Sequence, residues 1–392
     1  MNRIGPQLIA WCIALLVAAV SLVSLDYHVR DPDSILYAEI GARLAAQPVS
    51  TWITPTWPPG WYMSGLFQEH PAGLFVLPAA LTRLGFPGGQ AALLATALYQ
   101  AMALMLIPLV ARAFAEDIEA AALAWVLQLL PIAFTFRIRA NHEPAVLLFF
   151  LLALYGIERT ATGKRAGLLA AAAGLTGLML VKGLLVLPAL LCCALWIGAR
   201  GIRRAWLALG GATLVLGATA LAYEQIYRGV TGQSFISGYF GRSLSVGATA
   251  GHDWTAGTIP YNVLFYAGRV LWFAFPWSLA LAGAAWAWLR RSPRDTSRRA
   301  RGLFFALGVA ALYIGLFSLS TRRAERYIFP AYFVVGAAGA VAAMGKWAGV
   351  RAVATSVERM GPWVPPLVWL ALFSLHLAGG SLGLPHVQVW NP

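Results

Sequence analysis

The sequence predicts an all-α polytopic membrane protein, and three observations support this fold class. Of the 392 residues, 59% are hydrophobic and only 11% are charged, and the mean hydropathy is +0.69. A soluble chain of this size needs more polar residues to cover its surface. Apolar runs long enough to cross a bilayer also recur along most of the chain.

We expect about eleven of these runs to span the membrane as helices, since a span needs roughly 20 apolar residues. The segment 71–84 (PAGLFVLPAALTRL) is shorter, and we interpret it as a helix that lies in the membrane interface. The eleven predicted spans are 8–25, 91–113, 119–136, 144–159, 165–181, 183–199, 205–223, 261–289, 302–320, 327–345 and 363–380.

Short basic segments between the runs predict the orientation of the chain, because cytoplasmic loops carry an excess of Lys and Arg. A non-spanning 71–84 places all of these segments, and the N-terminus, in the cytoplasm. This arrangement accounts for the net charge of +14, so the charge does not point to nucleic-acid binding. The basic segments are RTATGKR (159–165), RGIRR (200–204), RRSPRDTSRRAR (290–301) and 346–359.

The remaining connections, 26–90, 137–143, 224–260 and 321–326, then face outward. Two of them are long, and long loops on a compact helical bundle usually carry function. We therefore predict a single transmembrane domain over 1–392, located in the inner (plasma) membrane, with its active site on the periplasmic side. Residues 26–90 are its first periplasmic loop with interfacial helices, and 224–260 its second long periplasmic loop. No soluble domain is expected after the last span.

The segment DPDSILYAEI, which begins at Asp31, predicts a helix start. Asp31 is suited to the N-cap and Pro32 to the first helical position. Asp33 then lies in the first turn, where the helix macrodipole favours a negative charge. Glu39 is four residues before Arg43, a spacing that favours an ion pair. Each carboxylate therefore has a structural explanation.

A second interpretation gives Asp33 a chemical role. A carboxylate in the first turn of a helix at the membrane surface is held ionised, as a general base must be. On a helix, Asp33 shares one face with Tyr37. The local sequence leaves both interpretations open.

Four cations, Arg139, Lys182, Arg242 and Arg326, lie near span ends on the predicted outward face, where Lys and Arg should be scarce. Each one alone is explained as an anchor or a snorkelling side chain. Together they are costly at the membrane, and such groups tend to be functional. Their pattern suits an anionic group at the level of the lipid headgroups, such as a lipid-linked phosphate or diphosphate.

A polyprenyl-phosphate sugar would present such a phosphate. Transfer of its sugar to an acceptor hydroxyl needs a carboxylate to take the proton and cations to stabilise the leaving phosphate. Asp33 and a basic cluster suffice for in-line displacement with inversion. A retaining route needs a carboxylate nucleophile as well. Since Glu69 and Glu143 are available, the residues alone leave the stereochemistry open.

Five segments extend this pattern in a fixed order: DSILYAEI (33–40), EHPAGLF (69–75), HEPAVLLFF (142–150), VKGLLVLP (181–188) and ERYIFPAYF (325–333), with FPWS (275–278) as a weaker sixth. They resemble motifs of the integral-membrane GT-C glycosyltransferases, especially the branch of the protein O-mannosyltransferases and the aminoarabinose (or galacturonic acid) lipid A transferases. The resemblance covers about residues 1–345. It implies a GT-C fold and an inverting glycosyltransferase that takes its sugar from a polyprenyl-phosphate donor.

By this resemblance, Asp33 is the catalytic base. His70 stands where the aminoarabinose branch has a Lys near the donor phosphate. Arg242 falls at a phosphate-contacting Arg, and Tyr327 at an aromatic hydroxyl of the donor site. The predicted donor-binding residues are thus His70, Lys182, Arg242, Arg326, Tyr327 and Arg139, and the predicted supporting residues are Tyr37, Glu69, Glu143 and His252.

Two positions depart from the family pattern. Ser34 replaces the usual second acidic residue, and Ala72 replaces the second Pro of its block. We therefore predict no metal site and no required cofactor. The resemblance implies a lipid-linked sugar donor and a hydroxyl acceptor, but it leaves open which sugar is moved. The acceptor, whether lipid A or lipopolysaccharide, another envelope glycan, a lipid or a protein, is also open.

Two other classes of function compete with this interpretation. A transporter or flippase for a lipid-linked anion often shows inverted repeats and broken helices near the membrane midplane. The sequence shows no such repeat, and its ionisable residues gather at one face. A lipid-binding subunit of an envelope assembly without catalytic activity is the third class.

Overall fold

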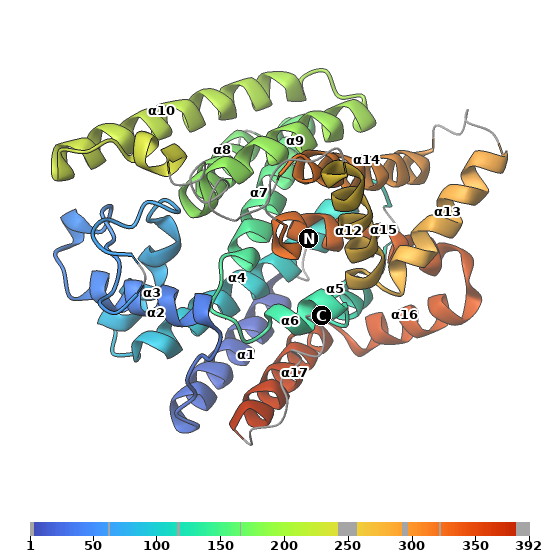
Figure 1. Cartoon of the computed structure of the whole chain (residues 1–392). Coiled ribbons are helices and arrows are strands. Elements are labelled where there is room, and N and C mark those ends of the chain that lie inside the picture. The colour runs from blue at the N-terminus through green and yellow to red at the C-terminus, as the bar shows by residue number, and fades with distance from the viewer. Residues whose placement is uncertain are drawn as a thin grey trace.

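The computed structural model describes the chain apart from residues 1–3, 62, 116–117, 165, 242–256, 292–296, 321–322 and 382–392. Within this part the chain is helical, and a single isolated bridge joins Thr56 to Leu66. The predicted all-α class is therefore confirmed (Figure 1). The helices are α1 (Ile4–Ser24), α2 (Pro32–Ala45), η1 (Val49–Thr51), α3 (Gly73–Arg83), α4 (Gly88–Ala111), α5 (Ala120–Leu127), α6 (Pro131–Phe136), α7 (Glu143–Ala161), α8 (Ala166–Lys182), η2 (Gly183–Leu185), α9 (Val186–Arg200), α10 (Ala205–Thr231), α12 (Thr258–Phe273), α13 (Trp277–Arg291), α14 (Arg298–Ser318), η3 (Glu325–Ile328), α15 (Phe329–Lys346), α16 (Ala348–Met360) and α17 (Val364–Ser381).

Seven helical segments of the described residues are long and apolar enough to cross a membrane, or nine if each of two bent pairs is one span. The pairs are α12 with α13, bent by 108°, and α16 with α17, bent by 95°. The expected count of eleven is therefore not confirmed. Residues 119–136 form two short helices, because Pro131 lacks the N–H that a continuous helix needs. The predicted spans 165–181 and 183–199 correspond to α8 and α9, which lie within one apolar segment, Ala166–Arg200. Helix α9 turns back along α8, because Arg200 at its end reaches Glu158 at the end of α7, beside the start of α8.

A backbone break divides this long segment between α8 and α9. Gly183 has a φ of +58°, in the left-handed region that favours glycine. A Cβ atom at Gly183 would also lie 2.6 Å from the hydroxyl oxygen of Tyr239. The turn therefore requires glycine for two reasons, and it places Lys182 at the end of α8.

Helices α7 and α8 pack antiparallel and very closely. A Cβ atom added at Gly156 would lie 2.1 Å from the backbone nitrogen of Ala171, and one at Gly174 would lie 2.4 Å from that of Ala153. Small residues allow such close approach between membrane helices. Because the helices run in opposite directions, the start of α7 and the end of α8 lie at the same end of the pair.

The first long connection folds against the bundle beside α10 (Figure 1, left). Its helix α3 has 11 residues, about 16 Å, which is too short to cross the bilayer core. The backbone N–H of Ala72 donates to the Tyr223 hydroxyl at 3.0 Å, and Gln68 Nε2 donates to the Ser234 carbonyl at 3.3 Å. The first long connection therefore packs against the end of α10 and the described residues that follow it. Helix α10 also extends eight residues beyond its expected end at 223, to Thr231.

The two largest apolar cores hold most of the helices together. The larger one includes buried side chains of α4, α7, α8, α9 and α15. The smaller one joins α1, α4 and α17, where Trp11 packs edge-on against Trp369 with 5.9 Å between ring centroids. The first and last helices therefore lie side by side (Figure 1, lower part).

Candidate active site

The first turn of α2 is built as the sequence predicts. Asp31 is the N-cap, and its carboxylate accepts the backbone N–H of Ser34 at 3.1 Å, while Pro32 occupies the first helical position. This cap fixes Asp33 in the first turn, with its side chain 37% exposed. The expected pair of Glu39 with Arg43 is wrong: Glu39 instead accepts a hydrogen bond of 2.8 Å from the indole N–H of Trp61.

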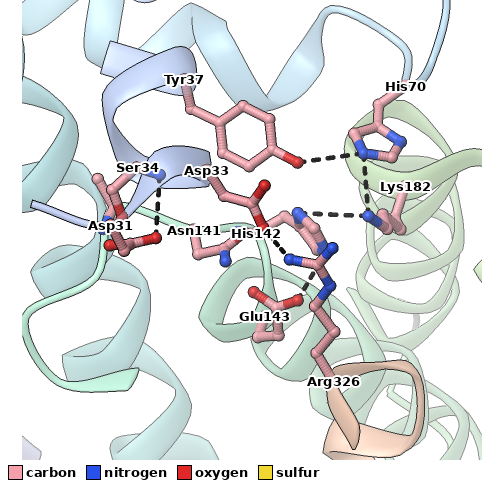
Figure 2. Close-up of polar contacts among 11 residues, drawn as sticks. Asp31, Asp33, Ser34, Tyr37, His70, Asn141, His142, Glu143, Lys182 and Arg326 are labelled. Carbon is pink, nitrogen blue, oxygen red and sulfur yellow. Dashed lines mark hydrogen bonds and ion pairs between the residues drawn. The ribbon is translucent and has the colours of Figure 1, made fainter. Parts of the chain in front are cut away.

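Asp33 forms an ion pair with Arg326, which is 293 residues away in the sequence. Arg326 lies in η3 immediately before α15, and the side chain is 26% exposed. The Tyr332 hydroxyl donates to the Glu325 carbonyl at 2.8 Å, which holds this turn onto α15. The pair is therefore accessible, and η3 presents the guanidinium directly to the start of α2 (Figure 2).

Ser34 connects α2 to the short connection before α7. Its fully buried hydroxyl oxygen accepts the backbone N–H of Ala140 at 2.8 Å. The next residues, Asn141, His142 and Glu143, are at most 2% exposed. This single bond thus holds the start of α7 beside Asp33. It also explains why a small hydroxyl residue stands where the family has an acidic one.

Lys182 links two histidines, the half-buried His70 and the buried His142. Its Nζ atom lies 3.0 Å from His70 Nε2 and 3.4 Å from His142 Nδ1. The hydroxyl of Tyr37 lies 3.3 Å from the same His70 nitrogen. Figure 2 shows these side chains directed toward one another and toward the Asp33–Arg326 pair. Five segments far apart in the sequence therefore contribute to one cluster.

Burial lowers the pKa of both His70 and His142 well below the usual value of 6.5, and the charge of Lys182 lowers each of them further. A backbone hydrogen bond with Glu69 acts in the opposite direction on the pKa of His70. We therefore assign both rings as neutral. His70 Nε2 and His142 Nδ1 then accept hydrogen bonds from Lys182.

The other nitrogen of His142 faces a carboxylate. His142 Nε2 lies 2.7 Å from Glu143 Oε1, although the angle does not meet hydrogen-bond geometry. We treat the contact as electrostatic and place the ring proton on Nε2. Burial also raises the pKa of Tyr37 well above 10, with the charge of Asp33 as the second cause. Tyr37 therefore remains a neutral hydroxyl at physiological pH.

The cluster contains six of the predicted site residues, and the charges of two more, Glu69 and Arg139, act on its members Tyr37 and Glu143. The Arg139 guanidinium packs over the ring of Phe136 at 5.5 Å. The Tyr327 ring stacks on Phe317 with 5.6 Å between centroids. Arg242 and His252 lie outside the described residues. The cluster itself includes Asp33, Tyr37, His70, Glu143, Lys182 and Arg326.

His142 belongs to the cluster but is absent from the site residues that the sequence predicts. The feature of the sequence that points to His142 is its place as the first residue of the HEP motif, directly before the buried Glu143. Among the described residues, no group of three or more His, Cys, Asp or Glu side chains is placed to hold a metal ion.

Comparison with protein-family models gives no match for this sequence, and comparison with curated protein sequences gives none either. Solved structures are similar to it. ArnT from Cupriavidus metallidurans bound to undecaprenyl phosphate has a TM-score of 0.68 and 18% identity, over 99% of this chain and 78% of that chain. The apo state of the same protein has a TM-score of 0.64 over the same shares, again at 18% identity.

A further match is an oligosaccharyltransferase from Archaeoglobus fulgidus in complex with zinc and sulfate, with 15% identity and a TM-score of 0.48, over 92% of this chain and 53% of that chain. The two ArnT structures establish the fold. The chain has the GT-C fold of ArnT over nearly its whole length.

Proposed function

We propose that this protein is an inverting glycosyltransferase that moves a sugar from a polyprenyl-phosphate donor to an acceptor hydroxyl at the outer face of the membrane. The observation that carries the proposal is the cluster itself. An accessible carboxylate, Asp33, lies against the Arg326 guanidinium, with Lys182 and His70 in the same cluster. The fold is shared with ArnT, whose structure contains undecaprenyl phosphate, and this supports a donor of that class.

In the proposed reaction, Asp33 takes the proton of the acceptor hydroxyl, and the acceptor oxygen attacks the anomeric carbon of the donor sugar. The bond from that carbon to the phosphate oxygen breaks, and the polyprenyl phosphate leaves with the bonding electrons. Arg326 and Lys182 stabilise the charge on this leaving group. Asp33 and Arg326 are paired in the structure, so a phosphate that binds Arg326 releases the carboxylate for its role as a base.

The test is a transfer assay with Asp33→Asn. Membranes that contain the full chain are incubated with an envelope extract and radiolabelled prenyl-phosphate mannose, aminoarabinose, galacturonic acid or arabinofuranose. We expect covalent label transfer by the native protein and none by Asp33→Asn. Asp26→Asn is the matched control, because Asp26 is an exposed carboxylate in the preceding connection. Normal turnover by Asp33→Asn removes Asp33 from the base role, and unmodified donor crossing the bilayer indicates a flippase instead.

Donor binding gives a second measurement. Loss of the charged Nζ in Lys182→Ala should weaken the affinity for polyprenyl phosphate about 10- to 100-fold, since a hydrogen bond to a charged group contributes about 1.5–3 kcal/mol. Lys164→Ala is the control, because Lys164 is exposed at the opposite end of α7 and α8. Unchanged donor affinity in Lys182→Ala contradicts a phosphate site at this cluster.

A further inference from the structure

A second site lies at the other end of the bundle. A cavity of about 450 Å³ that opens to the surface is lined by side chains of α4, α7, α9, α13, α14 and α15. Most of its lining is apolar, with Phe114, Trp196 and Phe305 among the larger side chains. The volume is in the range of small-molecule binding pockets. Nothing in the proposed transfer reaction uses this cavity.

One end of the cavity is polar and cationic. Its lining includes Ser297, Arg299 and Lys346 at this end, and all three residues are exposed. The two cations belong to different helices but lie close together, because a Cβ atom at Gly345 would be 3.0 Å from Arg299 Nη1. Ser297 caps the start of α14, where the macrodipole adds positive potential.

A buried donor at the same cavity points to a missing ligand. Trp288 lines the cavity, and its indole nitrogen is buried without a hydrogen-bond partner in the described part of the chain. Buried polar groups of this kind are rarely left unsatisfied. An ester or phosphate oxygen of a bound molecule would accept this N–H.

The cationic end is distant from the Asp33 cluster. Arg326 lies immediately before α15, and Lys346 ends it. The 18 residues of this helix correspond to about 27 Å, which is close to the thickness of the bilayer core. A phosphate held at Lys346 therefore lies at the opposite membrane face from Asp33. In Figure 1, α2 and α3 lie at the left, whereas α13 lies at the right.

We propose that this cavity binds one anionic phospholipid, with its phosphate between Arg299 and Lys346 and an acyl chain along the apolar interior. The shape and charge of the site select an amphiphile with a negative head. Its distance from Asp33 excludes a donor poised for transfer. The lipid joins α13, α14 and α15 at the face opposite the active site, and it is a resident lipid rather than a substrate.

Native mass spectrometry of the purified full chain tests the proposal, with phosphatidylglycerol and phosphatidylcholine of identical acyl chains as probes. We expect one phosphatidylglycerol to bind more tightly than phosphatidylcholine. Arg299→Ala/Lys346→Ala should weaken phosphatidylglycerol binding about 30-fold, because each surface cation contributes roughly 1 kcal/mol toward an anionic lipid. Arg203→Ala/Arg204→Ala, which removes two exposed cations outside the cavity, should leave binding unchanged.

A second variant tests the apolar part. Ala338 lines the cavity, and Ala338→Phe should displace the acyl chain and reduce binding while both cations remain. Equal affinity for the two lipids, or equal loss in the Arg203/Arg204 control, overturns the proposal. Displacement of phosphatidylglycerol by undecaprenyl phosphate also overturns it, because the occupant is then a substrate-type lipid.

Discussion

Ser34 shows how one hydroxyl positions two functional segments. It is fully buried and accepts the backbone N–H of Ala140, while the residue before it, Asp33, faces Arg326. An acidic side chain at this position would need a charged partner in a buried place, which is costly. The hydroxyl satisfies the peptide group without introducing a charge.

Ser34→Ala leaves the N–H of Ala140 buried without an acceptor. The cost of an unsatisfied buried group is about 1–3 kcal/mol, so we expect a lower unfolding temperature and reduced transfer activity. Thermal unfolding in detergent measures the first effect. Ser21→Ala is the control, because the Ser21 hydroxyl is exposed and donates within its own helix. Equal stability of Ser34→Ala and the native protein would show that the bond to Ala140 is dispensable.

The lowered pKa values of His70 and His142 lead us to expect that the protein loses stability in acid. The pKa values of His70 and His142 are lowered from 6.5, so below about pH 6.5 the unfolded state binds more protons than the native state. The free energy of unfolding is therefore largest above about pH 6.5. It falls as the pH decreases, by up to about 1.4 kcal/mol per pH unit for each histidine.

Thermal unfolding at about pH 7.5 and about pH 5.5 measures this slope. The native protein should lose stability at the lower pH, and His70→Gln and His142→Gln should each show a smaller loss. His28→Gln is the control, since the His28 side chain is 77% exposed. If the double variant His70→Gln/His142→Gln loses as much stability between the two pH values as the native protein, the two histidines are not neutral in the folded protein.

At the scale of elements, the pair α7 and α8 brings distant motifs together. His142 and Glu143 lie at the start of α7, and Lys182 at the end of α8. The close antiparallel packing of the pair therefore places Lys182 next to His142. Glycines at the contact make this approach possible, because any Cβ would separate the helices.

Gly174→Ala should destabilise the protein by about 1–3 kcal/mol, the usual range for overpacking, since the new Cβ would lie 2.4 Å from the Ala153 nitrogen. The matched control is Gly217→Ala in α10, where nothing lies within 4 Å of the added atom. That change should be neutral or slightly stabilising, because alanine favours a helix. Equal unfolding temperatures for the two variants would contradict tight α7–α8 packing.

At the scale of the whole molecule, distant segments converge at one end of the bundle: the start of α2, His70 in the connection before α3, the α7–α8 pair and η3. The predicted orientation assigns this end to the outside of the membrane. It assigns the end that carries Lys346 to the cytoplasm.

Cysteine labelling in intact cells tests this orientation. In a Cys12→Ser background, which removes the one exposed cysteine among the three, a membrane-impermeant maleimide should label Ser50→Cys directly. It should label Lys346→Cys only after permeabilisation; both positions are exposed. The reverse pattern would place the active site in the cytoplasm and contradict the use of a donor at the outer face.

The sequence by itself determined the helical membrane class, the capped start of α2 and the ordered motifs, because each depends on composition or on neighbours within a few residues. Its count of eleven spans is not confirmed, since apolar runs alone do not reveal that Pro131 interrupts a helix. Only the tertiary structure decided that Asp33 pairs with Arg326 and that Lys182 lies between two histidines. Contacts between residues so far apart depend on how closely the helices pack, and no local pattern encodes that distance.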